Sequence, residues 1–223
     1  MPAFWILMAA AAVAAGIDWV AVGTGTRRLE YAAKPAVLVA LVVAAAVIPV
    51  DRTDLMDRRW WFVAALVLCL VGDVLLMLPR NLFVPGLAAF LVGHVLFIVG
   101  LLQPPSPPGV PPFSFSTAGL VVAAAVVVTV EAAPGTRLLR SLLAGGERAL
   151  VPPVCIYVAA IATMVVLAVN VGILAAAAGA VLFLVSDTLL AWNRFVRTVP
   201  HGDLGVHVTY HLAQGLLVLS LLR

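Results

Sequence analysis

The sequence predicts an all-α membrane protein with eight transmembrane helices. Two observations lead to this prediction. Of the 223 residues, 64% are hydrophobic and only 10% are charged, whereas an average soluble domain is about 25% charged. The mean hydropathy is +1.17, and apolar stretches of about 20 residues, the length that crosses a bilayer, recur along the chain. Residues 1–223 are therefore expected to form a single transmembrane domain.

The apolar stretches give the limits of each predicted helix. The first stretch has no positively charged start of the kind that marks a signal peptide, so it is kept as a helix. The fifth is short for a span. The eight predicted helices are 3–22, 34–50, 60–78, 82–102, 116–131, 151–169, 172–192 and 205–222. The proline-rich segment 103–112 cannot be helical and is the main linker.

Charge and cysteine content exclude several classes of function. The net charge is +3, and no basic run with interleaved aromatic residues is present, so a nucleic-acid partner is not expected. Cys69 and Cys155 both fall within predicted spans and are interpreted as small buried residues rather than a disulfide framework. Membrane lipids are the expected surroundings, and the sequence leaves the oligomeric state open.

The distribution of basic residues predicts the orientation in the membrane, because Lys and Arg favour cytoplasmic loops. With both termini outside, nine basic residues lie on the cytoplasmic side and four on the other. The cytoplasmic set is Arg27, Arg28, Lys34, Arg80, Arg137, Arg140, Arg148, Arg194 and Arg197, and the outer set is Arg52, Arg58, Arg59 and Arg223. This orientation places most intramembrane polar residues toward the cytoplasmic leaflet of the cell membrane.

Two aspartates, Asp73 and Asp187, lie inside predicted spans. An isolated charge at the centre of a transmembrane helix costs roughly 2.5–3.5 kcal/mol on insertion scales, so such residues are usually functional. Their surroundings are similar, since GDVLL at 72–76 resembles SDTLL at 186–190. The similarity suggests a parallel 4+4 internal repeat with halves 1–102 and 116–223, which would bring the two carboxylates face to face.

Other polar residues near the two aspartates are candidates for substrate binding. Lys34 is the only lysine in the chain, and a lysine suits a phosphate contact or a counter-ion. Asp18 and Glu131 are second choices, because they lie near predicted helix ends. The candidate substrate-binding residues are Lys34, His94, Tyr157, Asn193, Arg194, Tyr210, His211 and Gln214. Each of them also has a structural interpretation, such as a hydrogen bond between helices for His94 or an interfacial position for Tyr157.

Several segments, taken in order, resemble the YhhN family of membrane proteins. They begin with Lys34-Pro35 and continue with GDVLLML, FVPGLAAFLVGH, GAVLFLVSD and TYHLAQ, which start at residues 72, 83, 179 and 209. The resemblance extends over nearly the whole chain. It implies an eight-helix fold, no obligatory cofactor, and Asp73 and Asp187 as the catalytic pair. The implied activity is lysoplasmalogenase-like hydrolysis of the vinyl-ether bond of a single-chain (lyso) ether phospholipid to a fatty aldehyde and a glycerophospho-alcohol.

The residues fit this chemistry. Vinyl-ether hydrolysis needs a proton donor for the alkene carbon, an anion near the resulting oxocarbenium ion and a base for water, and two carboxylates in different protonation states supply these roles. Lys34, Arg194 and Arg80 are expected to hold the phosphate. The sequence does not decide which aspartate is the acid.

Two other functions remain open at the level of sequence. A proton-coupled transporter of a small or lipid substrate also uses intramembrane carboxylates. A metal-dependent lipid hydrolase would use His94, His211, Asp73 and Asp187 as ligands, although their spacing matches no metal motif and no metal is expected.

Overall fold

The computed structural model describes residues 1–48, 53–78, 82–103 and 115–222. Within these ranges the chain forms eight α-helices and two short 3₁₀ segments, at 148–150 and 220–222, and no strand. The helices are α1 (Pro2–Thr24), α2 (Arg27–Ala46), α3 (Thr53–Met77), α4 (Phe83–Leu102), α5 (Thr117–Ala144), α6 (Val151–Asn170), α7 (Leu174–Phe195) and α8 (Gly202–Leu219). Eight segments of these ranges are long and apolar enough to cross a membrane. The predicted fold class is confirmed.

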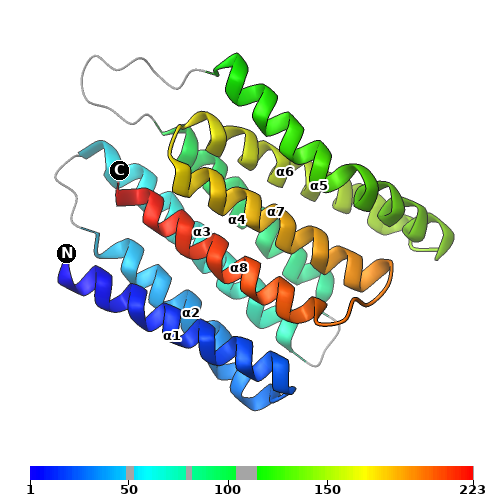
Figure 1. The fold of residues 1–223 in the computed structure, drawn as a ribbon, viewed down its shortest axis with the longest axis horizontal. Coiled ribbons are helices and arrows are strands. Elements are labelled where there is room, and N and C mark those ends of the chain that lie inside the picture. Colours follow the sequence, from blue (N-terminus) through cyan, green and yellow to red (C-terminus); the bar gives the residue numbers. More distant parts are fainter. Residues whose placement is uncertain (49–52, 79–81, 104–114, 223) are drawn as a thin grey trace.

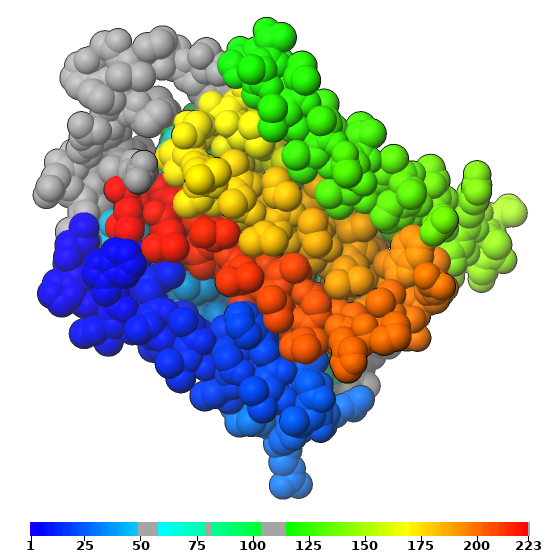
Figure 2. All heavy atoms as spheres, in the orientation of Figure 1, coloured from blue at the N-terminus to red at the C-terminus, as the bar shows by residue number. Residues whose placement is uncertain are grey.

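Consecutive helices pack as antiparallel hairpins, α1 with α2, α3 with α4, α5 with α6 and α7 with α8. Packing of α2 and α1 against α8, and of α4 against α6, joins these hairpins into one bundle. Figure 1 shows α3 and α8 between the α1–α2 hairpin and the remaining helices, with the N- and C-terminal ends of the chain at the same end of the bundle. Figure 2 shows α5 along an outer edge, beside α6 and α7.

Close packing of α7 on α8 depends on Gly179. A Cβ at this position would lie 3.0 Å from the carbonyl oxygen of Ala213 and 3.1 Å from the backbone nitrogen of Leu217. Small residues at such contacts let two helix backbones approach, which is a main source of packing energy between membrane helices. The close approach brings Asp187 of α7 and Tyr210 of α8 onto one side of the bundle core.

Several predicted helix boundaries are wrong, including the start of the third helix, which lies at Thr53 rather than at residue 60. The second helix begins at Arg27 rather than at residue 34, so Lys34 and Pro35 lie inside it. The fifth helix continues to Ala144 rather than ending at residue 131. It passes through Pro134, which removes one backbone N–H from the helix without ending it, and it packs on α6 and α7. The seventh continues to Phe195 rather than residue 192.

Three predictions about organisation stay predictions. The proline-rich linker lies outside the described residues, except for Gln103. The single transmembrane domain and the 4+4 repeat are not tested by the arrangement of helices alone.

Candidate active site

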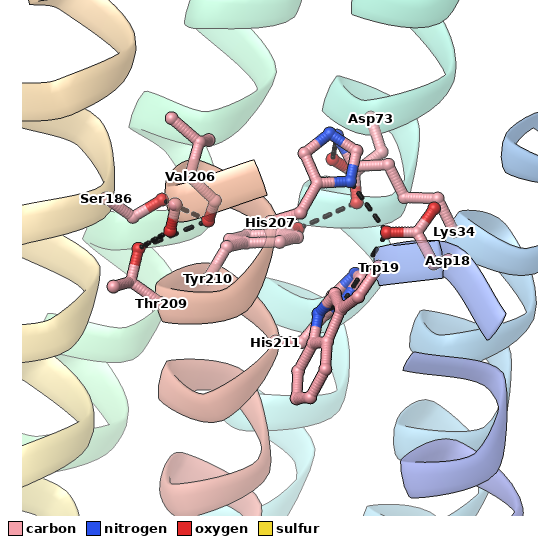
Figure 3. Close-up of polar contacts among 11 residues, drawn as sticks. Asp18, Trp19, Lys34, Asp73, Ser186, Val206, His207, Thr209, Tyr210 and His211 are labelled. Atoms are coloured by element: carbon pink, nitrogen blue, oxygen red, sulfur yellow. Dashed lines mark hydrogen bonds and ion pairs between the residues drawn. The ribbon is translucent and has the colours of Figure 1, made fainter. Parts of the chain in front are cut away.

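Asp73 is held by two side chains from other helices. It lies near the end of α3 and is only 1% exposed. Lys34 Nζ from α2 lies 3.0 Å from Asp73 Oδ1, and the Tyr210 hydroxyl from α8 donates to Oδ2 at 2.8 Å. Figure 3 shows both side chains directed at this carboxylate. Burial of a carboxylate is costly, and a cation at this distance offsets part of that cost.

Asp187, on α7, has a different environment. The Tyr157 hydroxyl from α6 donates to Asp187 Oδ2 at 2.5 Å, and His94 Nε2 from α4 lies 3.7 Å from the same oxygen. His94 Nδ1 lies 2.7 Å from the carbonyl oxygen of Phe90. A carbonyl only accepts hydrogen bonds, so Nδ1 carries the hydrogen and Nε2 of the neutral ring is an acceptor. The Nε2 lone pair of His94 therefore faces a carboxyl oxygen of Asp187. Two acceptors in this position need a hydrogen between them, either from the carboxyl group or from a water molecule.

The contacts of the two aspartates follow a common order along the chain. Asp73 on α3 is bound from the preceding helix by Lys34 and from α8 by Tyr210. Asp187 on α7 is bound from the preceding helix by Tyr157 and contacted from α4 by His94. Each carboxylate therefore uses one partner from its own half of the chain and one from the other half. Both predicted halves of the chain therefore contribute contacts to each of the two aspartates.

One polar cavity of about 490 Å³ contains both aspartates. It lies at the ends of α1, α2, α3, α7 and α8 that are opposite the two chain ends (Figure 1). Its polar and charged wall residues are Arg27, Glu30, Tyr31, Lys34, Asp73, Ser186, Asp187, Asp203, His207 and Tyr210. The sequence-based prediction that the two aspartates face a shared space is consistent with this cavity.

An apolar groove reaches Asp187 from the other side. It runs between α4, α5, α6 and α7, and its walls include Leu138, Val158 and Phe195. Asp187 and Leu190 line both the groove and the polar cavity. The Asp187 carboxyl therefore lies at the junction of a charged compartment and an apolar one.

Glu131 is an acidic group inside this groove. The Thr188 hydroxyl, next to Asp187 in the chain, is hydrogen-bonded both to Glu131 and to the carbonyl oxygen of Leu184. Thr188 therefore links Glu131 of α5 to α7 in the wall of the groove.

A second polar cluster joins α1 to α8 beside Asp73. His207 Nδ1 lies 2.6 Å from Asp18 Oδ2, and Trp19 Nε1 donates to His211 Nδ1 at 3.2 Å (Figure 3). Sequence reasoning ranked Asp18 second and did not select His207. The available signal was the four-residue spacing from His207 to His211, which places both histidines on one face of a helix.

The remaining predicted substrate-binding residues lie away from the cavity wall. Asn193 supports the α7–α8 turn, since it accepts from the Val199 N–H and donates to Asp203. The Arg194 guanidinium lies over the Phe83 ring. His211 and Gln214 are buried farther along α8, and within the described part of the chain the Gln214 amide has no hydrogen-bond partner. Arg80 lies outside the described residues.

Metal ligation was one of the predicted alternatives. Among residues 1–48, 53–78, 82–103 and 115–222, no group of three or more His, Cys, Asp or Glu side chains is arranged to hold a metal ion. His94 faces Asp187, whereas His211 belongs to the Asp18 cluster. Asp73, in turn, is bound by Lys34 and Tyr210, so the four residues predicted as possible ligands do not form one group.

Fold and site together define a multi-pass membrane protein with two carboxylates, Asp73 and Asp187, at a shared cavity. The chain belongs to the YhhN family, because the sequence model of that family matches residues 29–221. The resemblance noted from the sequence motifs is confirmed by this match. No solved structure matches the chain.

Curated relatives carry a consistent name. The chain is 35% identical over 159 residues to lysoplasmalogenase TMEM86B of Homo sapiens, a match that covers 71% of this chain and 62% of the human protein. It is 34% identical over 177 residues to the lysoplasmalogenase of Mycobacterium tuberculosis (strain CDC 1551 / Oshkosh), covering 78% of this chain and 62% of that protein. In both comparisons the match spans less than two thirds of the relative.

Proposed function

We propose that this protein hydrolyses the vinyl-ether bond of a lyso ether phospholipid, releasing a fatty aldehyde and a glycerophospho-alcohol. The observation that carries the proposal is the position of Asp187 at the junction of the polar cavity and the apolar groove. A single-chain ether lipid has the same division, with a charged head group, one hydrocarbon chain and the vinyl ether between them. The names of the relatives support the same reaction.

The head group enters the polar cavity and the hydrocarbon chain lies in the groove. Arg27 and Lys34 line the cavity and supply positive charge for a phosphate. Leu138, Val154 and Val158 offer the chain an apolar wall, and burial of each CH₂ group contributes about 0.8 kcal/mol. This pose places the vinyl ether beside Asp187.

Asp187 acts as the acid and Asp73 as the fixed anion. Asp73 is ion-paired with Lys34 at 3.0 Å and stays negative. Asp187 faces the acceptor nitrogen of His94 at 3.7 Å, and two facing acceptors are compatible when the carboxyl carries a proton. Two carboxyl groups in unlike environments divide the acid and anion roles in the same way in glycosidases.

The proposed reaction has three steps: protonation of the vinyl ether, addition of water and breakdown of the hemiacetal. The π electrons of the vinyl ether take the proton of Asp187 onto the carbon farther from oxygen, which gives an oxocarbenium ion near the Asp73 and Asp187 carboxylates. Water adds to the cationic carbon and returns one proton to Asp187. The resulting hemiacetal breaks its bond to the glycerol oxygen and yields the aldehyde and the alcohol.

The cavity faces the cytoplasmic leaflet in this proposal, and both termini are outside. Arg27 lies at its mouth, and Lys34 lies deeper on the same helix. The chain ends lie at the opposite end of the bundle (Figure 1). A preference of basic residues for the cytoplasmic side supports this orientation.

Incubation of the purified protein with lysoplasmalogen in D₂O tests the reaction. The expected product is a fatty aldehyde with one deuterium at its second carbon, because an acid in exchange with solvent protonates that carbon. Asp73→Asn and Asp187→Asn should each abolish release, and Glu147→Gln is the control, since Glu147 is an exposed carboxylate in the turn after α5. Full activity of both aspartate variants would show that the mechanism is wrong. Lipid movement across liposomes without aldehyde release would favour a transporter.

A further inference from the structure

Asp18 of α1 and His207 of α8 form a hydrogen-bonded pair at the edge of the proposed site. They are separated by 189 residues in the chain, and His207 Nδ1 lies 2.6 Å from Asp18 Oδ2. His207 lines the polar cavity together with Asp73 and Tyr210. Asp18 lies behind the histidine and is fully buried, at 0% exposure. The pair therefore has one end in the cavity and the other in the bundle interior.

The surroundings of Asp18 decide which atom carries the shared hydrogen. Trp19 Nε1 donates to His211 Nδ1, so that nitrogen is an acceptor and cannot donate to Asp18, from which it is 3.8 Å away. Asp18 Oδ1 has no hydrogen-bond partner among the described residues. A fully buried carboxylate needs a strong donor. His207 Nδ1–H is that donor.

This hydrogen bond determines which atom of His207 can exchange protons. With Nδ1–H held by Asp18, Nε2 is the ring atom left for proton transfer on the cavity side, as in other carboxylate–histidine pairs. Figure 3 shows the His207 ring next to Asp73 and Lys34. The titratable and charged side chains that line the cavity with His207 or contact it are Asp18 on α1, Arg27, Glu30, Tyr31 and Lys34 on α2, Asp73 on α3, Asp187 on α7, and Asp203, Tyr210 and His211 on α8.

We propose that His207 is the acid–base residue for the second half of the reaction, the breakdown of the hemiacetal, and that Asp18 is its positioning residue. His207 Nε2–H gives its proton to the glycerol oxygen as the carbon–oxygen bond breaks and its electron pair moves to that oxygen. The hemiacetal O–H electrons form the aldehyde C=O bond, and the released proton passes through cavity water back to Nε2. The inference rests on the proposed function, because it assigns a step of that reaction.

A single-turnover experiment with His207→Asn separates this step from the first. Asparagine keeps a donor near the position of Nδ1 and removes Nε2. Loss of the vinyl-ether double bond should stay within about threefold of the wild-type rate, whereas aldehyde release should fall at least tenfold, the lower range of an acid–base contribution. In Asp187→Asn, by contrast, the double bond should persist.

Asp18→Asn provides a second variant in case His207→Asn does not fold. The amide oxygen still accepts from His207 Nδ1–H, but the negative charge is lost, so aldehyde release should slow and the kcat–pH profile should change while KM stays the same. His201→Asn is the control, because His201 is exposed and its left-handed backbone conformation, with φ of 56°, suits asparagine. It should behave as the wild type.

The outcomes distinguish the inference from the function on which it rests. If the wild-type protein consumes no vinyl ether, the proposed function fails. If the wild type is active and His207→Asn either leaves both rates unchanged or slows both equally, the assignment of His207 to hemiacetal breakdown is overturned. A rise in KM alone would also overturn it, because it would mark His207 as a head-group contact.

Discussion

Lys34 Nζ lies 3.0 Å from Asp73 Oδ1, and both side chains are buried inside the helix bundle. The only lysine of the chain thus neutralises one of its two site aspartates. Lys34 also lies 5.7 Å from the centroid of the Tyr210 ring, which places this cation at the contact of α2, α3 and α8. The pair holds three helices together and also compensates a buried charge, and mutations of one or both residues distinguish these two roles.

Removal of one member of this pair should cost more stability than removal of both. Lys34→Met leaves an unpaired buried carboxylate, a change that typically destabilises by about 3–5 kcal/mol. In the double variant with Asp73→Asn, no isolated charge remains, so part of that loss should be recovered. Unfolding of the detergent-solubilised protein measures the four corners of this double-mutant cycle. Additive effects would mean that the two charges do not interact.

Loss of the Tyr157 hydroxyl should weaken catalysis more than folding. Tyr157→Phe removes the 2.5 Å hydrogen bond to Asp187 Oδ2. A hydrogen bond to the carboxylate that Asp187 becomes as it gives up its proton contributes about 1.5–3 kcal/mol, and each 1.36 kcal/mol is a tenfold change in rate, so kcat should fall about 10- to 100-fold. Aldehyde release measures the effect. Trp60→Phe is the control, because Trp60 is exposed and lies on α3 far from the end that carries Asp73. An equal fall in kcat in this variant would contradict the role of Tyr157.

The apolar groove should set the preference for chain length. Val158 of α6 is half-buried in its wall, and Val158→Phe would shorten the space available to a hydrocarbon chain. We expect kcat/KM to fall for long-chain lysolipids and to be retained for short-chain ones. Assay of a chain-length series checks this, with Val128→Phe on the exposed face of α5 as the matched control. An equal fall in kcat/KM at all chain lengths would show that the hydrocarbon chain of the substrate does not bind in this groove.

The orientation of the bundle can be measured with a reagent that does not cross membranes. A cysteine introduced at position 201, in the turn before α8, should react with a polar maleimide only after the membrane is permeabilised, because the proposal places this turn in the cytoplasm. A tag at either terminus should be accessible from outside without permeabilisation. The reverse pattern would invert the predicted topology.

How far sequence reasoning reached can be seen from particular residues. Asp73 and Asp187 were recognisable because a carboxylate in an apolar span is costly and therefore rarely accidental. Lys34 was selected, but its depth was misjudged, because a helix start is hard to place when a polar first turn precedes the apolar stretch. His207 was missed because nothing near it in the sequence indicates that Asp18 is its partner.

Length and apolar composition alone predict eight membrane-spanning helices and identify the spans that carry acidic groups. The contacts of Asp18 with His207 and of Lys34 with Asp73, and the position of Asp187 between a polar cavity and an apolar groove, are known from the folded structure alone. The physical reason lies in the solvent. Lipid is as apolar as the helix interfaces, so hydrophobic periodicity does not reveal which face of a membrane helix points inward. Close packing between small residues such as Gly179 and the backbone of a neighbouring helix sets that rotation, and with it the partners of every buried polar group.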